Sequence, residues 1–348
     1  MDTNKNYTDE FLSSKRLVGD IPADNFIQQE FRDAEAKEKL QEWLNGLADN
    51  LALCKVPECY FEQIIISQCQ QLPEWADNNM MKSGSAFFVR YAEQIMQLLG
   101  LLSLPYCYAA ADGAFVLYIS QRLQNDGRKR LLDTANFIWD VMAPNAFEKE
   151  GKGFASILKV RITHAAARYY TEKNLNWNID FGLPLNQEDM AGTNLSFSLI
   201  VIRGLRKLGL TISYTDQEAF LHLWNVIGSL LGIHDDLIAH TGKQSNHLEF
   251  AIRQRHIKPS LHGQLLTQSL INTFSSNQKS KISAKETSQL MRYLLGTEIA
   301  DILNLPNTSV PLYLPYILKA TTNFPDLKIS SNIHQAYQQK FLAFREQI

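Results

Sequence analysis

The sequence lacks an excess of charge of either sign. Its 34 Lys and Arg residues nearly balance its 36 Asp and Glu residues, which gives a formal net charge of -2. Proteins that bind nucleic acids or anionic membranes usually present a strong basic field, so this balance argues against both classes. The composition leaves a small, weakly polar ligand open, and we expect no nucleic-acid partner.

Long apolar runs are also missing. No stretch approaches 18 uninterrupted apolar residues, the length at which a membrane-spanning helix becomes the natural interpretation. The first residues, MDTNKNYTDEF, lack the apolar core of a signal peptide. The sequence therefore predicts a chain without an integral membrane segment and with a cytoplasmic location.

Cysteine is scarce and shows no pairing pattern. Cys54, Cys59, Cys69 and Cys107 form neither CxxC pairs nor a zinc pattern with histidine. Four cysteines in a chain of 348 residues do not form a disulfide scaffold, so we expect buried, reduced thiols. A Gly-x-Ser-x-Gly motif is absent as well, which leaves little support for covalent hydrolase chemistry.

Helical periodicity is what the sequence does contain. Apolar residues recur at three- and four-residue spacing, whereas alternating runs typical of strands are scarce. This pattern predicts an all-α fold, with a single large multi-helix domain over residues 1–348. The expected helices cover about 23–32, 34–53, 58–71, 84–101, 105–123, 127–142, 152–174, 186–208, 215–231, 247–256, 260–275, 284–304 and 332–346. The polar segment 275–283 has no periodicity and is the best candidate for a mobile linker.

The most informative segment is KVRITHAAARYY at 159–170. It places Arg161, His164 and Arg168 at positions i, i+3 and i+7, which lie on one side of a helix. A neutral imidazole is a good iron ligand, guanidinium groups can pair with carboxylates, and the alanines leave room beside the histidine. A single helical histidine is nevertheless more often a hydrogen-bonded structural residue, so the residues alone leave both interpretations open.

Two further segments carry polar side chains. Arg130 and Thr134 lie at i and i+4 on an otherwise apolar segment, where a solvated arginine and a threonine bonded to its own backbone are the simplest interpretation. In GLPLNQEDMAGTNLSFS at 182–198, Asn186 and Asp189 are a plausible pair for capping the next helix. Capping explains that segment without a catalytic role.

Together, these segments resemble the haem-binding oxygenase family of latex clearing protein and the MpaB-type enzymes. The resemblance is carried by Arg161-x-x-His164-Ala-Ala-x-Arg168, preceded by Arg130-x-x-x-Thr134 and followed by Asn186-Gln-Glu-Asp-x-Ala-Gly-Thr193. The opening Gly19-Asp-Ile-Pro-Ala-Asp24 also resembles the N-terminal signature of that family. The match covers about 20–235, which leaves 236–348 as an accessory helical part that packs against this core.

The resemblance implies a globin-like helical core that holds a b-type haem, with His164 as the axial ligand of the iron. Arg161 and Arg168 would lie near the haem or in its supporting shell, so these two residues and His164 form the expected cofactor-binding set. Arg130 and Thr134 would line the distal face and are the expected catalytic residues. O₂ would be the co-substrate, and any electron donor remains unidentified.

The sequence also departs from the rubber-cleaving members of the family. They carry a lysine directly before the threonine that matches Thr134, where this chain has Asp133. They also carry a glutamate about 20 residues before that threonine, where this chain reads Ala111-Asp-Gly-Ala-Phe115. We therefore expect an oxygenase that acts on an unsaturated, hydrophobic small molecule such as an isoprenoid or a lipid rather than on rubber.

Two other functions remain open. A haem-binding gas sensor or carrier would share the His164 ligand without turning over a substrate. A divalent-metal hydrolase could use His234, Asp235, Asp236 and His240 in GIHDDLIAHT, although further ligands at defined spacing are not evident and a polar turn after Gly232 also explains the segment.

Overall fold

A computed structural model describes residues 6–120, 122–173, 177–276, 282–311, 313–320 and 332–347. In these residues the regular elements are helices, and the one β contact is an isolated bridge between Ala110 and Ile257. The all-α prediction is confirmed. The first elements are α1 (Asp9–Lys15), α2 (Ile21–Glu30), α3 (Ala34–Gly46), α4 (Asn50–Leu53), η1 (Glu58–Tyr60), α5 (Ile64–Gln68), α6 (Asn78–Leu98), the π-helix η2 (Leu99–Ser103), α7 (Leu104–Ala109) and α8 (Ala111–Ile119).

The second half of the described chain is equally helical. The elements that surround the candidate site are α9 (Arg122–Met142), α10 (Gly153–Glu172), η3 (Ile179–Phe181), α11 (Gln187–Phe197), α12 (Leu199–Lys207), α13 (Tyr214–Leu230), η4 (Asp235–Leu237), α14 (Gly242–His256) and α15 (Leu261–Ser276). They are followed by α16 (Ala284–Leu295), α17 (Thr297–Ile302), α18 (Tyr313–Ala320) and α19 (Ile333–Gln347).

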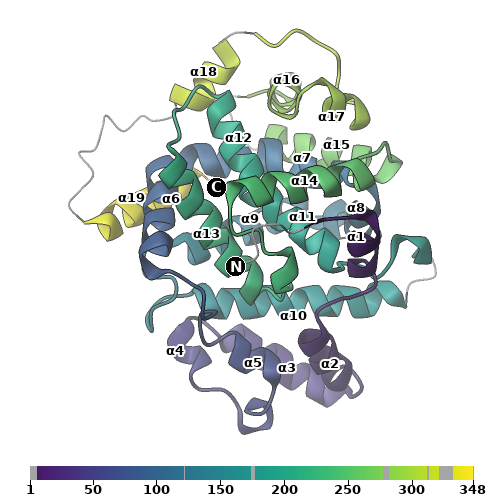
Figure 1. The fold of residues 1–348 in the computed structure, drawn as a ribbon, viewed down its shortest axis with the longest axis vertical. Helices are drawn as coiled ribbons and strands as arrows, with labels where there is room; N and C mark the ends of the chain where they lie inside the picture. The colour runs from purple at the N-terminus through teal and green to yellow at the C-terminus, as the bar shows by residue number, and fades with distance from the viewer. Residues whose placement is uncertain are drawn as a thin grey trace.

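The long helix α10 divides the molecule. In Figure 1 it crosses the lower part of the view, with α2 to α5 on one side and the larger group of helices on the other. It packs against α2 and α4 on the first side and against α9, α8 and α13 on the second. A side chain in the middle of α10 can therefore reach the interior of the larger group.

The core of the larger group is built around α6 and α13, which pack more extensively than any other pair of described helices. Gly84 allows this approach, because a Cβ atom there would lie 2.5 Å from the carbonyl oxygen of Ala219. At the far end, Trp139 of α9 packs against Phe88 and against the aromatic side chains of α19. These contacts fix α9, which carries Arg130 and Thr134, against the core.

Several predicted helices are interrupted, each for a local reason. The segment 34–53 is broken because Asp49 accepts a hydrogen bond from the backbone N–H of Ala52 and caps a new helix. The segment 284–304 is broken at Gly296, which has a φ of 84° and leaves the helical region. Breaks at Ala110 and Ser198 divide 105–123 and 186–208 in the same way. The predictions missed α1 and α18 altogether.

Two other predictions have mixed outcomes. All four cysteines are free, as expected, but Cys54 and Cys59 are exposed, so their predicted burial is wrong. In the predicted linker at 275–283, residues 277–281 lie outside the described residues. Its end is well defined, because Ser283 forms a reciprocal capping box with Glu286 at the start of α16.

The described C-terminal helices lie close to the candidate site. α15 packs against α7, α8 and α9, and α14 packs against α11, α12 and α13. The proposed division near residue 235 remains a prediction. Among the described residues, no helix has both the length and the apolar character needed to cross a membrane.

Candidate functional site

His164 lies in the second half of α10, in an alanine-rich stretch that favours helix and has only short side chains directly after the histidine. Its Nδ1 atom is covered by protein and has no hydrogen-bond partner among the described residues. The residue as a whole is partly buried.

The electrostatics of this position favour a neutral imidazole. Burial and the positive charges of Arg168 and Arg130 together lower the pKa of His164 to about 4, against an opposing effect of Asp20. Desolvation of this size means that the protein encloses the imidazole ring. At neutral pH, His164 therefore carries an unprotonated ring nitrogen, which is the form that binds metals.

Arg161 and Arg168 flank His164 along α10, and protein carboxylates hold both. Arg161 is 3% exposed and Asp20 is 2% exposed. The two form a forked pair, from Nε to Oδ2 at 2.5 Å and from Nη2 to Oδ1 at 2.8 Å. Arg168, 2% exposed, donates from Nε to Oδ1 of Asp24 at 2.6 Å.

The two guanidinium groups differ in their remaining donors. Arg161 also donates to Oε1 of Gln68 at 2.8 Å and to the carbonyl of Leu230 at 3.4 Å, so most of its donors have protein partners. Arg168 donates from Nη1 to the carbonyl of Leu185, but its Nη2 is covered and has no partner in the described part of the chain. Arg168 thus retains one buried donor.

Arg130 and Thr134 lie together on α9, as the sequence predicts. A small cavity between α7, α9 and α15 is lined by both residues and by apolar side chains that include Leu104, Tyr108, Leu131 and Leu270. The charge of Arg130 influences the pKa of both His164 and Tyr108, so it lies within electrostatic range of each. Asp133 is exposed and lies away from this interior.

The hydroxyl of Thr134 has a local partner. It donates to the carbonyl oxygen of Arg130 at 3.0 Å, one helical turn earlier. This is the backbone bond that the simplest interpretation of the sequence predicts. The hydroxyl oxygen keeps its capacity to accept a hydrogen bond.

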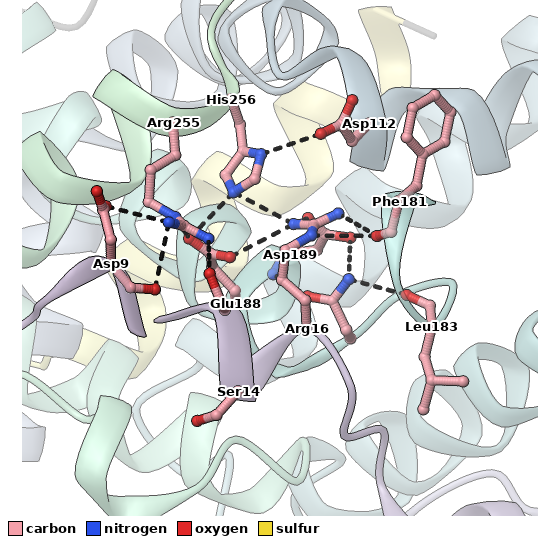
Figure 2. A network of polar contacts seen from close by, with 12 residues as sticks. Asp9, Ser14, Arg16, Asp112, Phe181, Leu183, Glu188, Asp189, Arg255 and His256 are labelled. Carbon is pink, nitrogen blue, oxygen red and sulfur yellow. Dashed lines mark hydrogen bonds and ion pairs between the residues drawn. The ribbon is translucent and has the colours of Figure 1, made fainter. Parts of the chain in front are cut away.

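Sequence reasoning missed a second buried polar cluster at the start of α11, here called the α11 network (Arg16, Asp112, Glu188, Asp189, Arg255 and His256). Figure 2 shows His256 between Asp112 and Glu188, with the two arginines on either side. Nε2 of His256 lies 3.0 Å from Oε1 of Glu188, and Nδ1 lies 3.3 Å from Oδ2 of Asp112. The capping role of Asn186 is confirmed by a 3.0 Å bond from the N–H of Asp189, but capping alone does not explain the buried carboxylates.

The α11 network balances its charges internally. Glu188 is fully buried and contacts Arg255 at 2.8 Å, while Asp189 contacts Arg16 at 2.9 Å. Burial opposes protonation of His256, but hydrogen bonds to Asp112 and Glu188 outweigh it and raise its pKa. Burial likewise opposes ionisation of Asp112, yet the bonds from His256 and Lys258 lower the pKa of Asp112 to about 2. These partners come from segments far apart in the chain, so no local pattern announces them.

The alternative metal segment at 232–241 does not assemble a ligand set in the described residues. Asp236 pairs with Lys15, and the ring of His240 packs edge-on against Trp75. No group of three or more His, Cys, Asp or Glu side chains in the described part of the chain is arranged to hold a metal ion.

Comparison with known proteins identifies the family. The family model described as "ER-bound oxygenase mpaB/B'/Rubber oxygenase, catalytic domain" matches residues 83–321, more than half of the chain. The chain is 25% identical over 252 residues to the rubber oxygenase of Streptomyces sp. (strain K30), a match that covers 70% of this chain but only 60% of that relative. A solved structure of latex clearing protein in the closed state shares the fold, with a TM-score of 0.78 and 22% identity over 94% of this chain and 91% of the other. The chain therefore belongs to the family of MpaB and rubber oxygenase catalytic domains.

Proposed function

We propose that this chain is a haem-dependent oxygenase that uses O₂ on an unsaturated, hydrophobic small molecule. The observation that carries the proposal is the state of His164, whose imidazole is neutral and whose buried Nδ1 has no hydrogen-bond partner among the described residues. Membership of an oxygenase family supports the same reaction class. His164 would hold the iron of a b-type haem through Nε2, because Nδ1 is covered by protein.

The charged residues around His164 fit such a cofactor. The free Nη2 of Arg168 is a buried donor that could bind a porphyrin carboxylate. Arg161 is engaged by Asp20 and Gln68, so we assign it to the supporting shell of the site. A bound haem would supply a redox-active iron for O₂ chemistry, and the protein would tune that iron through its axial ligand and the polarity of the pocket.

On the opposite side, we assign Arg130 and Thr134 to the distal wall. Arg130 supplies a positive charge within electrostatic range of His164, and the Thr134 hydroxyl can accept a hydrogen bond there. The apolar side chains beside them, Leu104, Leu131 and Leu270, suit a hydrocarbon substrate such as an isoprenoid or an acyl chain. Because Asp133 replaces the lysine of rubber-cleaving relatives and is exposed, we favour a small substrate over rubber.

The proposal is tested by reconstituting the chain with haemin and recording its spectrum before and after dithionite. The loaded protein is then incubated under O₂ with squalene, which has isolated C=C bonds, and in parallel with its saturated analogue squalane. We expect O₂ uptake and oxygenated products from squalene alone. A protein that binds haem and responds to O₂ without consuming squalene or other unsaturated lipids would instead be a sensor or carrier, and a protein that binds no haem would refute the proposal.

A further inference from the structure

The segment 19–24 lies along the face of α10 that contains His164. Asp20 holds Arg161, three residues before His164, and Asp24 holds Arg168, four residues after it. The histidine therefore lies between two ion pairs that join the same short segment to the same helix. This segment precedes residues 83–321, which the family model matches.

Both ion pairs are packed too closely to shift easily. A Cβ atom on Gly232 would lie 2.4 Å from Oδ2 of Asp20, and one on Gly19 would lie 2.5 Å from Oδ2 of Asp24. The carbonyl oxygens of these two glycines accept hydrogen bonds from the same buried amide, Nε2 of Gln187, at 2.8 Å each. The two pairs are thus tied to each other as well as to α10.

The ring of His164 lacks the contact that usually orients a metal-bound histidine. Such a histidine normally donates its other ring N–H to a carboxylate, a carbonyl or a water molecule. Here Nδ1 has no partner among the described residues. The position of the imidazole is therefore set by the placement of α10 and by the packing around the ring.

We propose that Asp20 and Asp24 are positioning residues for His164, which fix the axial ligand by clamping α10 on both sides of it. This inference rests on the proposed function. It assigns the N-terminal segment a role in cofactor retention through the arginines, without direct contact between the two aspartates and the haem.

The test measures haem dissociation from the full reconstituted chain in two backgrounds. The first background keeps His164. Asp20→Asn and Asp24→Asn remove the charge of each clamp at constant size. Glu30→Gln is the matched control, because Glu30 is a buried carboxylate on α2 that accepts a hydrogen bond from Tyr60. The second background is His164→Gly with added imidazole, in which the ligand is no longer attached to the helix. Transfer of haem to excess apomyoglobin gives the rate, and the Soret band reports the ligation.

With His164 present, we expect Asp20→Asn and Asp24→Asn to accelerate haem loss by about tenfold or more and to alter the Soret band. Glu30→Gln should change the rate by less than about twofold. In the imidazole background, the two Asp variants should lie within about twofold of their parent, because the detached ligand no longer depends on the position of α10. Should Asp20→Asn fail to fold, Asp24→Asn decides the question, since the Asp24 side chain is 32% exposed and its loss is better tolerated.

Two results would overturn this inference without affecting the proposed function. One is an equal acceleration in both backgrounds, which would mean that the aspartates act on general stability. The other is an unchanged rate in both Asp variants while His164→Gly without imidazole loses its ligation, which would leave the proposed function intact. If His164→Gly without imidazole keeps the parental spectrum and rate, the ligand assignment and the clamp fail together.

Discussion

His164 and His256 both lie inside the protein, but their surroundings shift the pKa of the imidazole in opposite directions. His256 contacts a carboxylate with each ring nitrogen, and its pKa is raised. His164 contacts no carboxylate directly, and burial with nearby arginines lowers its pKa to about 4. Burial lowers the pKa of both rings, so the opposite direction at His256 comes from the carboxylates that contact it.

The carboxylates near His164 are all committed to arginines. Asp20 and Asp24 neutralise Arg161 and Arg168, which leaves the imidazole between them neutral. In the α11 network, by contrast, two of the carboxylates, those of Asp112 and Glu188, contact His256 directly in addition to their other cationic partners. The arrangement at His164 leaves a nitrogen lone pair available for a ligand bond. The α11 network instead connects α11, α14 and the N-terminal segment through buried ion pairs.

The largest effect on the free energy of unfolding is expected from breaking the α11 network. Glu188→Ala would leave Arg255 and His256 without their shared buried carboxylate, so we expect a loss of about 3–5 kcal/mol in the free energy of unfolding. Arg90→Ala, which breaks a more exposed pair with Asp216, should cost only about 0–1 kcal/mol. Urea unfolding measures both, and equal losses would contradict the idea that the α11 network is a structural joint.

The next effect is that the two histidines make the free energy of unfolding depend on pH with opposite signs. Because the folded-state pKa of His164 is lowered to about 4, protonation favours the unfolded chain, and haem-free protein should lose at most about 3 kcal/mol as pH falls from about 6.5 to 4. Because the folded-state pKa of His256 is raised, its contribution is complete below its ordinary pKa near 6.5 and is lost as pH rises through the folded value. Unfolding of His164→Gln and His256→Gln, measured from about pH 4 to well above the ordinary histidine pKa of about 6.5, should remove the acid-side and the alkaline-side losses respectively. The same sign for both variants would refute the comparison.

A smaller effect is expected at the clamp itself. Gly232 has a φ of 91° and approaches Asp20 closely, so Gly232→Ala combines backbone strain with displacement of the carboxylate and should cost about 1–3 kcal/mol. Gly46→Ala is the control, because an added Cβ there meets nothing within 4 Å. Thermal unfolding compares the two variants, and an unchanged melting temperature for Gly232→Ala would show that the clamp is loosely packed.

The smallest effect on stability is expected on the distal wall. Thr134→Val removes a hydroxyl that donates a local hydrogen bond to the carbonyl of Arg130, so the fold should lose about 1 kcal/mol or less. If Thr134 accepts a hydrogen bond during the reaction, squalene-dependent O₂ uptake should fall several-fold while haem content stays constant. Thr134→Ser, which keeps the hydroxyl, should retain the parental rate. Equal rates in Thr134→Val and the parent would remove Thr134 from the catalytic set.

Local features of this site were predictable from the sequence, and non-local ones were not. The helix around His164, the Asn186 cap and the bond from Thr134 to Arg130 each involve residues within four positions of one another, where composition and spacing carry the signal. The pairs between Arg161 and Asp20 and between His256 and Asp112 span 141 and 144 residues. Such pairs leave no periodic trace, because tertiary packing alone selects the partner of a buried charge. The same limit explains why the sequence predicts only capping for the segment 182–198, although the structure buries the carboxylate of Glu188 there.

The account is tested most directly by the absorption spectrum of the haemin-reconstituted chain with His164→Ala, recorded beside that of His256→Gln. We predict that His164→Ala loses the Soret band of histidine-ligated haem and most of its haem content. His256→Gln should keep both wherever circular dichroism shows that it is folded. An unchanged Soret band and haem stoichiometry in His164→Ala would contradict the assignment of His164 as the ligand.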